Sequence, residues 1–281
     1  MYKIGVDIGG TKINFVLLKN SKIVRTGRIA TPKSKAKLIE VLVKNIERLI
    51  SNLPKSKISG IGLGVPSPLD LKGDLILNPV NIRCLRNVRL AKIIQKKVKI
   101  KTVMANDADC FALAETLWGA GKGARTVFGM TLGSGVGGGI VMAGKIYRGT
   151  FGSAGEAGHM MIDSDGSLED YCSAKFFLKQ GFSPQELSEM AKRGDKKAQK
   201  IYREYGRYLG IGLSNIVNIL DPQVFILGGG IANSFPLFIE QAKKEVDKRA
   251  ISPLSRKYVK IRKAKLGELA GAIGAALLTN R

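Results

Sequence analysis

Residues 2–18 read YKIGVDIGGTKINFVLL, two apolar runs separated by the pair Gly9-Gly10. Apolar runs bounded by a glycine turn are typical of β-strands joined in a hairpin, so we expect strands at 2–7 and 12–18. A third strand is expected at 22–30, which would make the start of the chain a β-meander.

Beyond this meander the sequence alternates between helical and strand patterns. Apolar residues recur at helical spacing from Ile39 to Leu53, and Pro54 follows at the expected end of that helix. Alternation of this kind favours an α/β fold. Further strands are expected at 58–65, 101–104, 126–132, 136–142 and 224–227, and further helices at 111–118 and 198–220.

The chain contains an internal similarity. VDIGGTKINFVLL (6–18) and MTLGSGVGGGIVM (130–142) both place a glycine turn between apolar strands, as expected if two domains share one supersecondary plan. The length of 281 residues also suggests two domains. Since no low-complexity linker separates the halves, the segment 119–124 (GAGKGA) is a hinge candidate.

Composition excludes several classes of protein. No apolar run is long enough to span a bilayer, and Asp7 interrupts what would be the apolar core of a secretory signal, so we expect a cytoplasmic protein without membrane association. Cys84, Cys110 and Cys172 lie far apart, which indicates neither a disulfide scaffold nor a cysteine metal site.

The net charge of +24 raises nucleic acids, membrane surfaces and polyanionic ligands as partners without choosing among them. Much of the excess lies in 85–101 and 241–265. Because no aromatic residues are interleaved for base stacking, we favour a solvated basic face over a nucleic-acid interface.

Three glycine turns carry the first chemical signal: 7–12 (DIGGTK), 133–139 (GSGVGGG) and 228–230. None matches a Walker A loop or a dinucleotide-binding GxGxxG motif. Tight hairpins alone would explain any one of them, but together with flanking hydroxyl residues they favour backbone amides that cradle phosphate. Asp7 is a candidate to hold Mg²⁺ through water.

Polar residues at two further places suggest a reaction. At Asn106-Asp107 a strand ends and a helix begins, so the pair is either a helix N-cap or the position of a general base. The stretch 152–170 contains several acids and no Lys or Arg, and Glu156 and His159 at i, i+3 would offer hydrogen bonds to a polyhydroxylated ligand. A lone histidine is otherwise usually structural.

Six motifs in this order resemble those of the ROK sugar kinases, and the resemblance runs from residue 4 to the closing LGELAGAIGAALL. The motifs are DIGGTK (7–12), NDA (106–108), TLGSGVGGG (131–139), GEAGH (155–159), LEDY (168–171) and LGGGI (227–231).

The resemblance implies a two-domain, actin-like ATPase (ribonuclease H-like) fold with a central cleft. It places an N-terminal α/β domain at 1–118, completed by a C-terminal helix at 267–281, and a C-terminal α/β domain at 119–266. It further implies ATP-dependent, Mg²⁺-assisted phosphorylation of a hexose hydroxyl by a homodimer.

The same resemblance assigns roles to residues. Asp107 would be the general base on the sugar hydroxyl, and Asn106, Glu156, His159 and Glu169 would hold sugar hydroxyls beside it. The nucleotide would contact Asp7, Gly9, Gly10, Thr11, Lys12, Thr131, Gly133, Ser134, Gly135, Gly228, Gly229 and Gly230. Many members carry a CxCGxxGC zinc cluster where this chain has Met160 to Ser167 without cysteine, so no structural zinc is expected.

Two alternatives stay open. The family contains polyphosphate-dependent glucokinases, which the positive charge would suit. It also contains sugar-responsive repressors with an added N-terminal helix-turn-helix domain. Because the first expected strand starts at residue 2, we expect no room for such a domain and no specific nucleic-acid partner.

Overall fold

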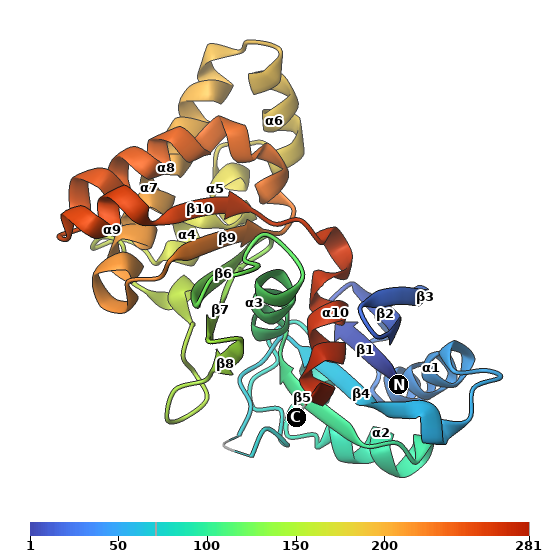
Figure 1. Ribbon diagram of the computed structural model, residues 1–281. Helices are drawn as coiled ribbons and strands as arrows, with labels where there is room; N and C mark the ends of the chain where they lie inside the picture. Colours follow the sequence, from blue (N-terminus) through green and yellow to red (C-terminus); the bar gives the residue numbers. More distant parts are fainter. Residues whose placement is uncertain (71, 281) are drawn as a thin grey trace.

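The computed structural model describes residues 1–70 and 72–280 and contains two five-stranded sheets (Figure 1). The first has the order β3-β2-β1-β4-β5 and the second the order β10-β9-β6-β7-β8. In each sheet the first three strands in chain order pair antiparallel, and the two later strands join them in parallel. The first sheet comprises β1 (Tyr2–Ile8), β2 (Lys12–Lys19), β3 (Lys22–Ala30), β4 (Ile58–Val65) and β5 (Thr102–Asn106). The second comprises β6 (Thr126–Leu132), β7 (Val136–Met142), β8 (Lys145–Tyr147), β9 (Val224–Gly228) and β10 (Lys260–Lys263).

Two helices cover the outer face of the first sheet, α1 (Lys35–Leu49) and α2 (Leu90–Val98). The Ser34 side chain caps α1 by accepting the Lys37 amide, and Leu38, Leu42 and Ile46 form its buried stripe. Strand β3 is mostly exposed and carries Lys and Arg, which protects this edge of the sheet from pairing with another chain.

The second half has a larger helical layer around an aromatic core. Helix α7 packs along α8, and its buried Tyr202 and Tyr205 lie against Phe177 and Phe238. The helices of this half are α4 (Leu168–Cys172), α5 (Ala174–Lys179), α6 (Pro184–Lys192), α7 (Lys196–Leu220), α8 (Phe235–Arg249) and α9 (Pro253–Tyr258).

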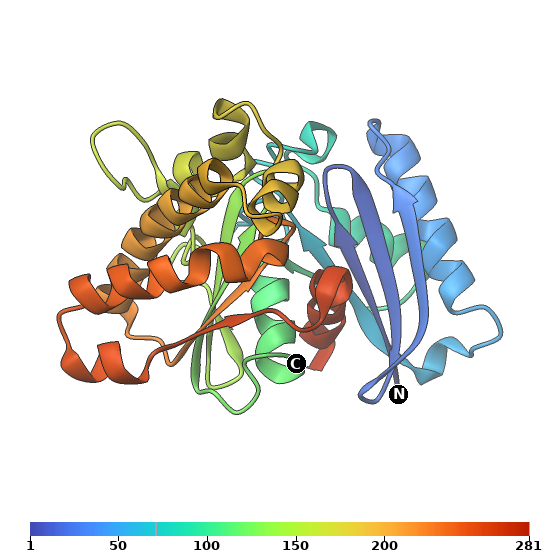
Figure 2. The same ribbon diagram turned by 90° about the horizontal axis from the view of Figure 1, so that it is seen from above.

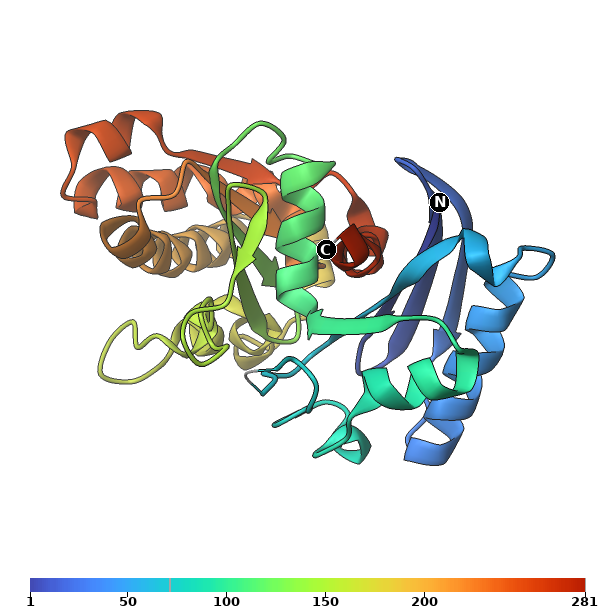
Figure 3. The ribbon, with the colours of Figure 1, turned by 60° about the horizontal axis from the view of Figure 1, so that its bottom comes forward.

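Helices α3 (Asp107–Leu117) and α10 (Ala270–Leu277) lie together between the two sheets (Figures 1 and 2). Each follows the last strand of one sheet and packs on the other: α3 on β6 and β7, α10 on β1 and β4. Figure 3 shows the resulting layers, with α1 and α2 outside the first sheet and α3 beside the C-terminal helix. Gly5 and Gly62 make the approach of α10 possible, because a Cβ at either position would collide with the carbonyl of Ala272 or Ala275.

The α/β class expected from the sequence is confirmed, as are the paired strands around the glycine turns at 9–10 and 133–135. The internal similarity corresponds to two sheets of the same strand order. Among the described residues no helix is both long and apolar enough to cross a membrane. The domain limits 1–118, 119–266 and 267–281 remain a proposal, and Arg281 lies outside the described residues.

Candidate functional site

A cavity of about 610 Å³ lies between the two halves, where α3 and α10 begin. Seven residues expected from the sequence line it: Asp7, Lys12, Asp107, Thr131, Gly228, Gly229 and Gly230. Its volume is within the range of small-molecule sites, which is 300–1,000 Å³ in broad terms. The fold therefore brings into one cavity predicted residues that are more than 200 positions apart in the sequence.

Asp7 and Asp107 form the acidic wall of this cavity. They come from the carboxyl ends of the parallel strands β1 and β5, with β4 between them. Gly64 of β4 separates the two: a Cβ there would lie 3.7 Å from Asp7 Oδ1 and 3.7 Å from Asp107 Cα. The carboxyl ends of parallel strands are where open α/β sheets commonly bind ligands.

Asn106 and Asp107 have different roles at the start of α3. Asn106 is the N-cap, since its Oδ1 accepts the amides of Ala108 at 2.8 Å and Asp109 at 3.4 Å. Asp107 is the first residue of α3, and its carboxylate accepts the Ala108 amide at 2.8 Å while it lines the cavity. The capping role of Asn106 therefore leaves Asp107 available to a ligand.

Both cavity acids have raised pKa values. Burial, and then the charge of Asp107, raise the pKa of Asp7 to about 7, against a lowering by Asn14 and Lys12. Burial raises the pKa of Asp107 to about 6, with a smaller contribution from the charge of Glu156. Two carboxylates in one cavity with pKa values near neutrality are suited to proton transfer and to binding a cation.

The acids and the cavity fit a magnesium ion in donor type. Mg²⁺ commonly binds to one or two carboxylates and keeps several waters. Asp7 would hold such an ion, and a cation there would oppose both the burial and the charge of Asp107 that raise its pKa. Lys12 lies beside it, with its Nζ 2.8 Å from Glu268 Oε1.

The facing wall is formed mainly by backbone of the second half. Thr131 at the end of β6 pairs with Gly228 at the end of β9. Gly228 has no room for a side chain because the Phe111 ring packs on it, and Gly229 adopts a φ of +85° against the Leu132 backbone. Gly230 has open space on its side-chain position, so a ligand can approach the main chain there.

Six predicted nucleotide residues do not line this cavity: Gly9, Gly10, Thr11, Gly133, Ser134 and Gly135. The first turn is closed by the Gly9 amide on the Lys12 carbonyl at 3.0 Å and supported by the Thr31 hydroxyl, which donates to Gly9 O at 2.6 Å. Their contact with a nucleotide stays a prediction.

The predicted sugar residues differ in their surroundings. Glu169 accepts the Val136 amide at 3.1 Å and pairs with Lys175 Nζ at 2.8 Å, so it supports the 133–135 turn. His159 lies on a 3₁₀ turn with its side chain 79% exposed, and its Nε2 is 4.0 Å from Glu156 Oε2. Asn106 lines a smaller adjoining cavity of about 180 Å³.

Sequence reasoning missed several lining residues. Asn14 pairs across the first hairpin with Asp7 and hydrogen-bonds to it, a partner that the hairpin register could have identified. Lys263 and Lys265 line the cavity, whereas the sequence predicts a solvated basic face for the stretch 241–265. No local pattern distinguished these two lysines, because their position depends on the crossing from β10 to α10.

Comparison with known proteins agrees with this geometry. The model of the ROK family matches residues 3–281. An N-acetyl-D-glucosamine kinase of Photobacterium profundum is 32% identical over 98% of this chain and 98% of its own. The xylose repressor of Bacillus subtilis is 30% identical over 97% of this chain and 75% of its own length.

Among solved structures, the ROK family glucokinase of Streptomyces griseus in complex with glucose and AMPPNP superposes with a TM-score of 0.85. It is 29% identical and is matched over 99% of both chains. The resemblance in fold and the expected actin-like architecture are confirmed by this agreement over the whole length. On the family match and these relatives, the chain belongs to the ROK family.

Proposed function

We propose that this protein is an ATP-dependent sugar kinase that transfers the γ-phosphoryl group of ATP to a hydroxyl of a hexose. The observation that carries the proposal is the position of Asp107, at the carboxyl end of β5, facing the main chain of 228–230 across one cavity. Two relatives support it, since one is a glucokinase in complex with glucose and AMPPNP and one is an N-acetyl-D-glucosamine kinase.

In this mechanism Asp107 accepts the proton of the sugar hydroxyl. The hydroxyl oxygen then forms its bond to the γ-phosphorus, the bond to the bridging oxygen breaks, and ADP leaves with the electron pair. The pKa of about 6 keeps Asp107 largely ionised at neutral pH and still basic enough to take the proton. Mg²⁺ supplies charge neutralisation on the phosphates.

The remaining residues would position the substrates and screen the negative charge of the phosphates. Asp7 would hold the cation, while Lys12, Lys263 and Lys265 bring positive charge to the same cavity. The glycines at 228–230 let the nucleotide approach the main chain, and the two halves would close to exclude water. Asn106, Glu156, His159 and Glu169 are proposed to hold the sugar, which requires His159 to turn inward from its exposed position.

The experiment is a panel of glucose, mannose, fructose, allose and N-acetylated hexosamines, each with ATP and Mg²⁺ in a coupled ADP-release assay. We expect turnover with at least one hexose. A parallel set with polyphosphate in place of ATP tests the polyphosphate-dependent alternative, which the three cavity lysines favour.

Absence of transfer from either donor to every sugar would contradict the proposal. Specific operator binding in the same preparation would then indicate a regulator, as in the xylose repressor. We further propose a homodimer, which sedimentation equilibrium would test.

A further inference from the structure

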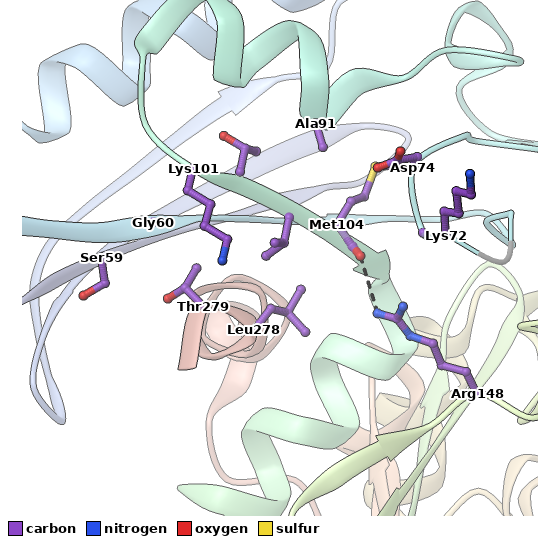
Figure 4. A pocket seen from close by; sticks show the side chains of 13 residues that line it. Ser59, Gly60, Lys72, Asp74, Ala91, Lys101, Met104, Arg148, Leu278 and Thr279 are labelled. Atoms are coloured by element: carbon purple, nitrogen blue, oxygen red, sulfur yellow. Dashed lines mark hydrogen bonds between the residues drawn. The ribbon is translucent and has the colours of Figure 1, made fainter. Parts of the chain in front are cut away.

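Cationic side chains are arranged differently at two cavities of the molecule. A cavity of about 240 Å³ lies along β5, apart from the large cavity of about 610 Å³ (Figure 4). Figure 4 shows Lys72 and Lys101 at its opposite ends, and Arg148, which donates to the Met104 carbonyl at 3.4 Å. At the large cavity, by contrast, two cations meet at one carboxylate, that of Glu268.

Glu268 lines the large cavity without a part in the reaction described above. Apart from Asp7 and Asp107, it is the one acid among the described residues that line this cavity. It lies on the 3₁₀ turn Gly267–Leu269, through which the chain passes from β10 to α10. Because its side chain is 61% exposed, its ion pairs rather than close packing hold its carboxylate in place.

Side chains from one face of the first sheet hold Glu268. Lys12 and Asn14 are two positions apart on β2, so they project on the same side, and Asn14 pairs with Arg28 of β3. Lys12 Nζ lies 2.8 Å from Glu268 Oε1, and Arg28 Nη1 lies 2.9 Å from Oε2. The Asn14 side chain donates to the Glu268 carbonyl at 3.2 Å. Each carboxylate oxygen therefore has its own cation, and of the two cations Lys12 is the one that lines the cavity.

Lys12 is shared between two acids. Burial raises the pKa of Asp7, whereas Asn14 and Lys12 lower it. The same Lys12 ammonium, through its hydrogen bond and its charge, holds the pKa of Glu268 below its usual range. A phosphate that reaches Lys12 must therefore exchange with a carboxylate that is already bound to it.

The surroundings of Glu268 make this exchange easy. Ion pairs between exposed side chains contribute little, and charge-assisted hydrogen bonds such as those from lysine to phosphate are stronger than neutral ones. When Lys12 turns to a phosphate, the Glu268 carboxylate keeps its contact with Arg28 and is not left unpaired.

We propose, on the basis of the function proposed above, that Glu268 sets the affinity for the nucleotide by competing with its phosphates for Lys12. In the free protein Glu268 holds the Lys12 ammonium beside Asp7. The phosphates then displace the carboxylate, which stays on Arg28. Glu268 is thus a positioning residue that acts through Lys12.

The test is calorimetric titration of the full chain with AMPPNP and Mg²⁺ in the absence of sugar. Glu268→Gln keeps the shape of the side chain and removes its charge, so the nucleotide should bind about twofold to fivefold tighter. Arg28→Gln leaves the carboxylate to Lys12, so the nucleotide should bind about twofold weaker. The matched control is Glu40→Gln on α1, an acid that is 60% exposed and 2.9 Å from Lys37 Nζ, and its affinity should equal that of the wild type.

Double variants separate this competition from a general loss of negative charge near the phosphates. If Glu268 acts through Lys12, Glu268→Gln no longer tightens binding in the Lys12→Gln background. Likewise, Arg28→Gln no longer weakens binding in the Glu268→Gln background. A general charge effect would leave each factor unchanged in the double variants, and that result would overturn the proposal. Equal or weaker binding by Glu268→Gln alone would overturn it as well.

Steady-state kinetics distinguish a failure of this proposal from a failure of the proposed function. Glu268→Gln should lower the KM for ATP and leave the KM for the sugar unchanged, a split that a general structural change would not produce. AMPPNP binding that follows the expected pattern, without phosphoryl transfer to any hexose, would contradict the proposed function alone. A wild-type protein that does not bind AMPPNP would refute the role given to Glu268.

Discussion

The two halves have the same strand order but different chemistry at equivalent strand ends. In the first half the last residue but one of β1 is Asp7, which pairs with Gly64 of β4. In the second half β6 reaches Thr131 at the equivalent position, which pairs with Gly228 of β9. One half therefore presents a carboxylate to the cavity where the other presents a hydroxyl and bare main chain.

The helices extend this comparison. Gly271 at the start of α10 packs on the Asp7 carboxyl group, where a Cβ would lie 2.7 Å from Asp7 Cγ. Ala108 at the start of α3 packs on the hairpin of the second half, within 3.1 Å of where a Gly137 Cβ would be. Each half therefore packs on a helix that follows the other half's sheet, and this arrangement is symmetric. The polar residues at the strand ends, Asp7 and Thr131, differ. The duplicated fold thus supplies the cavity, and a few asymmetric residues supply the chemistry.

The largest effect on stability is expected at Glu115, where the two connections between the halves meet. This fully buried side chain accepts the amides of Ala120 at 2.8 Å, Lys265 at 2.9 Å and Leu266 at 2.7 Å. Glu115→Ala leaves these three amides without their acceptor and should lower the free energy of unfolding by about 4 kcal/mol.

Chemical denaturation measures this loss, with the exposed Glu47→Ala on α1 as control. A loss below about 1 kcal/mol would mean that the two crossing segments are held independently of Glu115.

The next effect is on the pH dependence of stability. It is expected for Asp7 and not for its counterpart Thr131. Since the folded-state pKa of Asp7 is about 7, above the ordinary aspartate value of 3.8, the folded protein binds this proton more tightly than the unfolded chain. Wild-type stability therefore falls as the pH rises through about 7. Asp7→Asn should be more stable than wild type by on the order of 3 kcal/mol at pH 8, and the difference should disappear near pH 4.

Thermal or urea unfolding of the ligand-free protein across this pH range checks the Asp7 prediction. Thr131→Val in the second half should show no such pH-dependent difference. A constant offset for Asp7→Asn at all pH values would show that the carboxyl group has an ordinary pKa.

The close helix contacts should be similarly important in both halves. A Cβ at Gly62 would collide with the Ala275 carbonyl of α10, and one at Gly129 would lie 2.7 Å from Ala112 Cβ of α3. Each alanine substitution should lower the free energy of unfolding by about 1–3 kcal/mol. Gly27→Ala in β3 is the control, since its nearest contact would be an ordinary 3.7 Å. If calorimetry found that only one of Gly62→Ala and Gly129→Ala is destabilised, the helix contacts of the two halves would not be equivalent.

The smallest effect on stability is expected at Gly230, where a substitution should change nucleotide binding without changing the fold. Its φ of −61° and ψ of −38° suit alanine, and no heavy atom lies within 4 Å of the added Cβ. Gly230→Ala should leave stability within about 0.5 kcal/mol and raise the KM for ATP roughly threefold to tenfold, because the methyl group obstructs approach to the main chain. An unchanged KM would remove Gly230 from the nucleotide site.

Local signals were sufficient for much of this architecture. The glycine turns and apolar runs around Gly9 and Gly133 predicted the hairpins because a turn and its flanking strands are close in sequence. The polar pair at 106–107 indicated a strand end, though not that Asn106 would cap α3 and leave Asp107 to the cavity. The roles of Glu115, Lys263 and Lys265 were not predictable, since each depends on contacts between segments that are far apart.

The central claim is that Asp107 removes a proton from the sugar hydroxyl, and Asp107→Asn tests it most directly. Steady-state kinetics with the sugar selected by the hexose panel would compare this variant with Asp165→Asn, an exposed acid of the 152–170 stretch. We predict that kcat falls by about 10² or more in Asp107→Asn, with sugar affinity retained, and is unchanged in the control. A kcat for Asp107→Asn within about twofold of the wild-type value would contradict the account, since general-base loss costs far more.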